Sequence, residues 1–157
     1  MLELKHLTVR YGEHTVLDDV SCAIETGTVT LLTGESGSGK TTLLNNLTLQ
    51  KINEEADYYL NGKRLNYRNT KKIAYIQNQI MTYVGQDFVL LNTSVEKNLK
   101  AFYAMNPKNR KKKISRKQIE KWLNAVNLDV QLRRSKVQNL SGGERQRLAL
   151  ACALAKN

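Results

Sequence analysis

An α/β fold is predicted for this chain of 157 residues, and three observations support the prediction. A β-prone run at 29–33 leads into a glycine- and serine-rich loop, which is followed by a helix with periodic apolar residues. An Asn-Gly pair between two apolar edges at 58–65 is a strong hairpin signal. Three capping boxes open helices in the second half of the chain. The length fits one ordinary domain.

The first half of the chain is predicted to form mainly strands. Leu2–Arg10 is predicted to be a strand with a bulge near His6, where the apolar pattern changes phase. Two short strands are expected at Val20–Ile24 and Val29–Thr33, separated by a turn. A helix is expected from Thr41 to about Leu49, and then the hairpin around Asn61-Gly62.

The second half of the chain is predicted to form mainly helices. Residues 71–92 are ambiguous between strand and helix, with a strand expected at Met81–Gly85. Capping boxes at Thr93–Glu96, Ser115–Gln118 and Ser141–Glu144 are each expected to open a helix. The first of these helices is expected to run to about Met105.

Composition excludes several classes of protein. An apolar share of 41% supports a packed core and argues against disorder throughout. The longest apolar run, Leu148–Ala155, is too short to span a membrane, and the N-terminus does not resemble a secretory signal. Cys22 and Cys152 are expected to be reduced, buried thiols, because no metal-binding spacing surrounds them.

The positive charge is partly local. The chain has 25 Lys and Arg against 14 Asp and Glu, a net charge of +11, and seven of the cations lie between Lys108 and Lys117. Such a run is typical of a solvated loop, while contact with anionic lipid or with nucleic acid remains an alternative. The absence of aromatic residues in this run weakens a role in binding single strands.

The segment Gly34–Thr41 matches the pattern GxxxxGK[ST] between a predicted strand and a predicted helix. Glycines let backbone N–H groups point at phosphate oxygens, and the following helix presents its positive end to the same anion. Lys40 is expected to reach the β- and γ-phosphates, and the Thr41 hydroxyl to bind Mg²⁺. A flexible glycine turn is the alternative, although a chance match is expected in only about one chain in 200 of this length. The predicted nucleotide-binding residues of this loop are Gly34, Glu35, Ser36, Gly37, Ser38, Gly39, Lys40, Thr41 and Thr42.

A second candidate anion site is formed by Leu140, Ser141, Gly142, Gly143 and Glu144. A serine N-cap followed by two glycines exposes free backbone N–H groups at the start of a helix. The alternative is that Ser141 and Glu144 merely cap the helix, but capping alone does not require two glycines.

The two motifs, about 100 residues apart and in this order, resemble the nucleotide-binding domain of ABC-type ATPases along the whole chain. The resemblance implies a P-loop NTPase core of the ABC ATPase type, with an antiparallel β subdomain and a helical subdomain. It assigns 1–92 to the core and β subdomain, 93–140 to the helical subdomain, and 141–157 to the signature motif and its helix. The C-terminal part of the core is expected to be missing.

The resemblance also implies residue roles. Tyr11 occupies the position of the aromatic residue that stacks on adenine, and Val16 belongs to the same nucleotide-binding stretch. Gln86 occupies the position of the glutamine that contacts Mg²⁺ and the attacking water, so Lys40 and Gln86 are the implied catalytic residues and Thr41 and Gln86 the implied metal ligands. On the residues alone, Tyr11 as a turn aromatic and Gln86 as a loop glutamine remain alternatives.

The implied function is that of an ATP-binding subunit of an ABC transporter, with ATP and Mg²⁺ as cofactors. The implied partners are a separate transmembrane permease and a second ATP-binding subunit. The γ-phosphate of the ATP bound by that second subunit is implied to contact Ser141, Gly142 and Gly143 of this chain. The implied location is cytoplasmic, at the inner face of the cell membrane. Nucleic acid is not an expected partner, although a soluble ABC protein acting on nucleic acid or the ribosome is kept as an alternative.

The chain lacks the family's next element, an apolar strand ending in Asp-Glu that supports Mg²⁺ and polarises water. The 157 residues alone are therefore expected to hydrolyse ATP poorly or to bind it without turnover. The run Val29–Thr33 is expected to keep an unpaired edge and to expose apolar surface.

Overall fold

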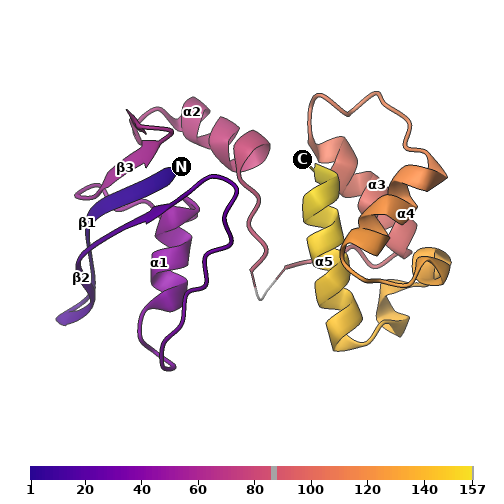
Figure 1. The fold of residues 1–157 in the computed structure, drawn as a ribbon, viewed down its shortest axis with the longest axis horizontal. Coiled ribbons are helices and arrows are strands. Elements are labelled where there is room, and N and C mark those ends of the chain that lie inside the picture. The colour runs from indigo at the N-terminus through magenta and orange to yellow at the C-terminus, as the bar shows by residue number, and fades with distance from the viewer. Residues whose placement is uncertain (86–87, 157) are drawn as a thin grey trace. The chain divides into compact units, whose positions relative to one another are not determined.

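A computed structural model describes residues 1–85 and 88–156. The chain divides into two compact units, Met1–Gln77 and Asn78–Asn157, and each is described by itself (Figure 1). Within the described residues, none of the helices combines the length and the apolar character that crossing a membrane requires.

The first unit is built on an antiparallel sheet with the strand order β2-β1-β3-β4. Its strands are β1 (Leu2–Tyr11), β2 (His14–Ile24), β3 (Asp57–Leu60) and β4 (Lys63–Arg64). The register between β1 and β2 shifts between Leu4 and Leu7, where His6 has a φ of 56°. The shift confirms the predicted bulge, and it lets both leucines be fully buried although they are an odd number of residues apart.

The hairpin between β3 and β4 is also confirmed. Asn61 and Gly62 have φ values of 50° and 73°, as a two-residue turn with two left-handed positions requires. Backbone pairing continues beyond the short β4, because the Leu65 N–H donates to the Tyr58 carbonyl over 2.7 Å.

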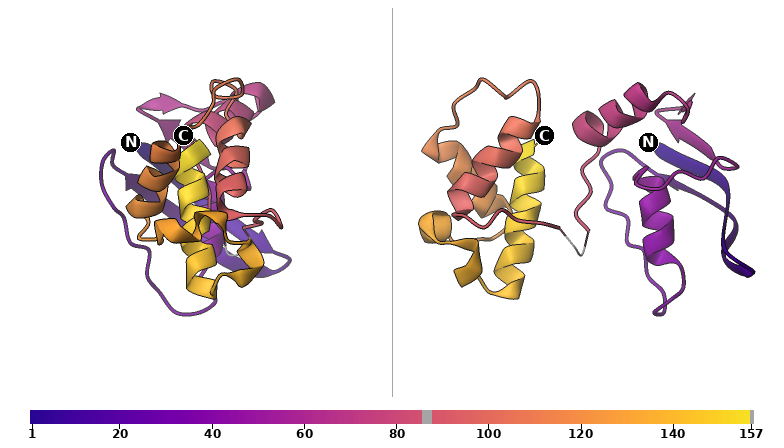
Figure 2. Two further views of the ribbon diagram at one scale, coloured as in Figure 1. Left: turned by 90° about the vertical axis from the view of Figure 1, so that its right-hand side faces the viewer. Right: turned by 180° about the vertical axis from the view of Figure 1, so that it is seen from behind.

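Helix α1 (Lys40–Leu47) packs on β1 and β2 (Figure 2). The buried Tyr58 hydroxyl joins α1 to β3, since it donates to Asn46 Oδ1 over 3.1 Å and accepts from the Asn53 N–H over 2.9 Å. Helix α2 (Thr70–Tyr75) starts at the cap formed by Asn69 and continues as the π-helix η1 (Ile76–Ile80).

Two predicted strands are not formed. Val29–Thr33 is irregular, with Val29 and Leu31 100% and 83% exposed, and Met81–Gly85 is irregular as well. A strand needs a neighbouring backbone to bond with, and in the described residues the only sheet is the four-stranded one, which includes neither segment. The expectation that Val29–Thr33 exposes apolar surface is confirmed.

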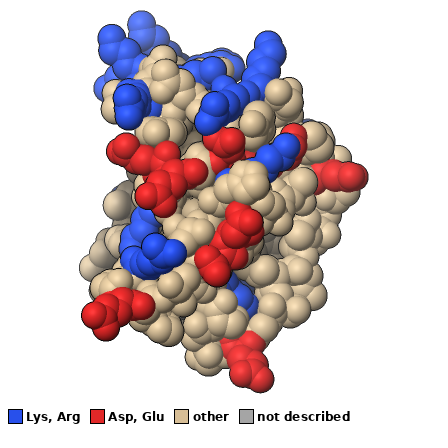
Figure 3. Space-filling view, turned by 90° about the vertical axis from the view of Figure 1, so that its left-hand side faces the viewer, with Lys and Arg blue, Asp and Glu red and all other residues tan. Residues whose placement is uncertain are grey.

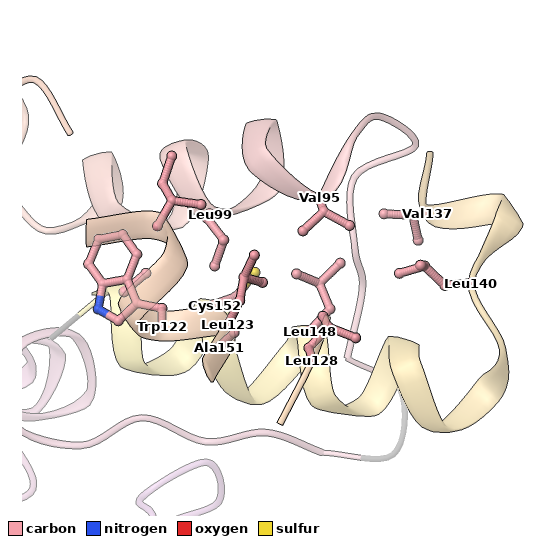
Figure 4. Close-up of a cluster of buried hydrophobic side chains, with 12 residues drawn as sticks. Val95, Leu99, Trp122, Leu123, Leu128, Val137, Leu140, Leu148, Ala151 and Cys152 are labelled. Atoms are coloured by element: carbon pink, nitrogen blue, oxygen red, sulfur yellow. The ribbon is translucent and has the colours of Figure 1, made fainter. Parts of the chain in front are cut away.

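The second unit is helical. It contains α3 (Val95–Met105), α4 (Arg116–Ala125), η2 (Val130–Arg134), η3 (Val137–Asn139) and α5 (Gly142–Lys156), with α3 and α4 packed on α5 (Figure 1). Their buried side chains form one core (Figure 4), which is made of Val95, Leu99, Ile119, Trp122, Leu123, Leu128, Val137, Leu140, Leu148, Ala151, Cys152 and Ala155. Both cysteines are free thiols; Cys152 is buried and Cys22 half-buried.

Two of the three predicted caps are confirmed. Ser115 Oγ accepts from the Gln118 N–H over 3.2 Å, and Ser141 and Glu144 bond reciprocally. The cap of α3 lies one residue later than predicted: Ser94, not Thr93, accepts a backbone N–H, that of Lys97. Glu96 bonds instead to Lys100 and to Arg133, which pulls its carboxylate away from the start of the helix.

Candidate functional site

The loop before α1 depends on glycines at two close approaches. A Cβ on Gly39, the N-cap of α1, would lie 2.9 Å from Leu17 Cδ2 and 3.1 Å from Val16 Cγ1. A Cβ on Gly34 would lie 2.8 Å from Ser38 Oγ. Both residues also have positive φ values, 86° and 154°. Strand β2 therefore fixes where α1 begins, and the loop folds tightly upon itself.

Lys40 is folded back over this loop. Its Nζ donates to the Gly34 carbonyl over 2.9 Å, to Ser38 Oγ over 3.4 Å and to the Glu35 carbonyl. Three oxygens of the loop thus surround the ammonium group. An anion that enters the loop meets a cation that is already held above it.

The N-terminus of α1 is open toward the same space. No side chain caps this helix, and its first turn holds no acidic residue. The partial positive charge of the helix end is therefore not neutralised locally. Thr41 is exposed and Thr42 half-buried in this first turn, and Ser36 and Gly37 are exposed in the loop. The arrangement suits a polyphosphate, with the Thr41 hydroxyl free to bind a divalent cation.

The structure brings Val16 to the loop through its contact with Gly39. Tyr11 lies at the end of β1, with its side chain 52% exposed and Lys51 Nζ 5.7 Å from the ring centroid. The ring is accessible to a flat ligand. Gln86 lies outside the described residues.

The second motif begins α5. Leu140 is buried in the helical core, while Ser141, Gly142 and Gly143 are exposed. The Glu144 carboxylate accepts from the Ser141 N–H over 2.7 Å and from the Ser141 hydroxyl over 2.8 Å. These bonds, together with the charge of Arg147, lower the pKa of Glu144. Around Gly142 there is open space, since a Cβ there would meet no atom within 4 Å.

The sequence analysis assigned no role to two arginines of α5. Arg145 Nε donates to the Leu140 carbonyl over 3.0 Å, and Arg147 Nε is buried without a partner among the described residues. Both cations lie just after the two glycines and add positive charge to the start of the helix. The Arg-x-Arg spacing after a Gly-Gly helix start is the sequence signal that could have identified them.

A hollow of 610 Å³ lies beside the start of α5 in the second unit, and sequence reasoning did not predict it either. Phe88 and Leu90 line one part of it, and Arg145, Ala149 and Leu150 of α5 line another. Val89 and Leu91, which alternate with the lining residues, are 78% and 45% exposed.

The model of one protein family, described as ABC transporter, matches residues 17–157. The chain belongs to the ABC transporter family. It is 34% identical over 98% of its length to the macrolide export ATP-binding/permease protein MacB of Pasteurella multocida, of which it covers 24%. It is 33% identical over its whole length to an uncharacterized ABC transporter ATP-binding protein, MJ1508, of Methanocaldococcus jannaschii, of which it covers 71%.

Solved structures agree with this membership. The ATP-binding cassette MJ0796, in a dimeric post-hydrolysis state bound to ADP and Pi, superimposes with a TM-score of 0.80 at 27% identity. The match covers 99% of this chain and 70% of that one. The fold is therefore that of an ABC ATPase cassette. Of several curated relatives, among them MacB, the chain spans less than half the length.

Proposed function

We propose that the chain binds ATP at Gly34–Thr42 and acts as an ATP-binding subunit of an ABC transporter. The observation that carries the proposal is the placement of the Lys40 ammonium, held by Gly34, Glu35 and Ser38 oxygens beside the uncapped N-terminus of α1. A cation, an open helix end and a glycine-lined loop together form a cradle for a polyphosphate.

The residues of the loop have separate tasks in this proposal. Backbone N–H groups from Gly37 to Thr42 bind the phosphates. The Lys40 ammonium gives up its hydrogen bonds to loop carbonyls and donates instead to β- and γ-phosphate oxygens. Tyr11 stacks on the adenine from its accessible ring face. A bound Mg²⁺ supplies positive charge to the phosphates, and Thr41 and Gln86 are the residues proposed to hold it.

A second copy of the chain is the proposed partner across the nucleotide. In that arrangement Ser141, Gly142 and Gly143 meet the γ-phosphate bound by the other copy, supported by their exposure at the start of α5. Ser141→Arg is expected to leave ATP binding by one copy unchanged and to abolish ATP-dependent dimerisation in light scattering. Dimerisation that survives the substitution contradicts this part of the proposal.

The membrane partner is proposed to be a separate permease. The segment 86–99 is the proposed contact region, which the exposed Val89 and Leu91 support. In this proposal the chain acts at the cytoplasmic face of the cell membrane, where it couples ATP binding and hydrolysis to transport.

A second candidate function is ATP binding without turnover by these 157 residues. Two of the acidic side chains serve as caps: Asp129 Oδ1 accepts from the Gln131 N–H, and Glu144 caps α5. Carboxylates held in this way are poor candidates to polarise water or to support a metal. Phosphate release from ATP, measured alongside binding, separates the two functions.

The test of the site is calorimetric titration of the chain and of Lys40→Ala with Mg-ATP. Loss of charge-assisted bonds to two phosphates is expected to weaken binding at least about tenfold. Lys63→Ala removes an exposed lysine on β4 and serves as the control. Tight binding by Lys40→Ala, or equal loss in both variants, contradicts the assignment.

A further inference from the structure

The loop between α3 and α4 carries the densest positive charge of the chain. No acidic residue occurs between Glu96 and Glu120, whereas nine lysines and arginines lie between them. Seven of these lie in the segment Lys108–Lys117, which includes the first two residues of α4 and is called the basic loop below. All seven are exposed: Lys108, Arg110, Lys111, Lys112, Lys113, Arg116 and Lys117. Arg116 pairs with Glu120 over 2.6 Å, and within the described part of the chain the other six have no ion pair.

The backbone under these charges is anchored at both ends. Asn106 is 5% exposed, donates from Nδ2 to the Lys156 carbonyl over 2.9 Å, and accepts from the Lys108 N–H over 3.0 Å. At the other end Ser115 caps α4, and Ile114 packs against the helical core. The lysine side chains therefore project from a fixed support, so that little backbone conformational freedom is lost when they bind.

The surroundings favour a lipid surface over a nucleic acid. The two nearest aromatic residues, Tyr103 and Trp122, pack on each other with centroids 5.6 Å apart, and Trp122 is only 9% exposed. Although both line a hollow beside Lys113, their rings offer bases a smaller stacking surface than two exposed rings would. Five of the seven cations are lysines, which act as point charges rather than as planar forks. Met105 is 54% exposed just before the loop and adds an apolar side chain suited to the headgroup region.

We infer that the basic loop binds the surface of a membrane containing anionic phospholipids. Each lysine near such a surface contributes roughly 1 kcal/mol, so several together give substantial attraction. The inference goes beyond the proposed function, because it requires neither ATP nor a permease. ATP binding is measured separately, so the failure of one proposal leaves the other standing.

The experiment is co-sedimentation of the chain with vesicles of phosphatidylcholine alone and of phosphatidylcholine with phosphatidylglycerol. The triple variant Lys111→Ala, Lys112→Ala, Lys113→Ala removes three exposed charges from the loop. The matched control is Lys63→Ala, Lys71→Ala, Lys72→Ala in the first unit, whose three lysines are also exposed. Figure 3 shows Lys and Arg gathered at the upper end of the face that it views, with acidic residues below them. Because the control removes three lysines elsewhere in the chain, the comparison distinguishes the basic loop from positive charge in general.

The chain is expected to bind the anionic vesicles and not the neutral ones. The loop variant is expected to bind about 100-fold more weakly, and the control to change less than about threefold. Raising NaCl from about 0.05 to 0.5 M is expected to release the chain. Equal binding to neutral vesicles, equal loss in both variants, or binding to RNA or DNA that exceeds binding to vesicles overturns the inference.

Discussion

Asn98 is the most informative residue for testing how the helical unit is held together. It lies on the buried face of α3 and is fully buried. Its Oδ1 accepts from the Leu91 N–H over 2.8 Å, and its Nδ2 donates to the Leu91 and Ser94 carbonyls over 3.0 and 3.1 Å. One side chain therefore fixes the segment that leads into α3.

The cost of Asn98→Ala follows from these three bonds. At about 1 kcal/mol each, their loss amounts to about 3 kcal/mol. The two carbonyls keep other donors, the Thr93 and Asn98 N–H groups, so only the Leu91 N–H loses its partner. Leu91 is 45% exposed, so water can reach this group and the penalty stays moderate. Alanine recovers about 0.5 kcal/mol of helix propensity. The expected loss in the free energy of unfolding is therefore about 2.5 kcal/mol.

Urea unfolding followed by tryptophan fluorescence measures this value. Trp122 is the only tryptophan of the chain and belongs to the same core, so its signal reports on the helical unit. Asn124→Ala, an exposed asparagine on α4, is the matched control and is expected to change the unfolding free energy by less than about 0.5 kcal/mol. A loss below about 0.5 kcal/mol in Asn98→Ala would refute the reasoning.

Three further predictions concern single groups. Tyr11→Ala is expected to weaken ATP binding by roughly 1 kcal/mol in calorimetry if adenine stacks there, and unchanged affinity would favour the turn-aromatic alternative. The pKa of Glu144 is lowered from 4.5 in the folded chain, so its contribution to stability is present above that pH and is lost as the pH falls below it. Acid titration of Glu144→Gln should show a smaller loss of stability, and an unchanged curve would contradict the capping role. Burial raises the pKa of Cys152 to about 12, so Ellman's reagent should label the half-buried Cys22 in the folded chain and Cys152 only after unfolding; rapid labelling of both thiols would contradict its burial.

The features that the sequence predicted correctly are those whose conformation depends on interactions between residues only a few positions apart. The turn at Asn61-Gly62 requires two left-handed positions, and the caps at Ser115 and Ser141 join groups three residues apart. Such local chemistry is visible in the sequence because no distant residue takes part.

The features that the sequence analysis predicted wrongly or missed depend on residues far away in the chain. Val29–Thr33 has β-prone residues, but a strand also needs a neighbouring backbone. Glu96, which the predicted box pairs with Thr93, bonds instead to Lys100 and to Arg133, and Arg133 lies 37 residues beyond it. Asn98 was missed because a polar residue between Val95 and Leu99 interrupts the apolar pattern and gives no sign of its backbone partners.

The two anion sites share a property that bears on how strongly each can bind. The Lys40 ammonium is held by oxygens of its own loop, and the Ser141 hydroxyl is held by Glu144. A phosphate must replace these internal bonds, so the net gain at each site is smaller than the new contacts alone would supply. The backbone N–H groups at the start of α1 face no such competition from a side-chain cap. We therefore expect the open helix end to provide most of the net affinity for the phosphates, and Lys40 to contribute most where phosphate charge is greatest.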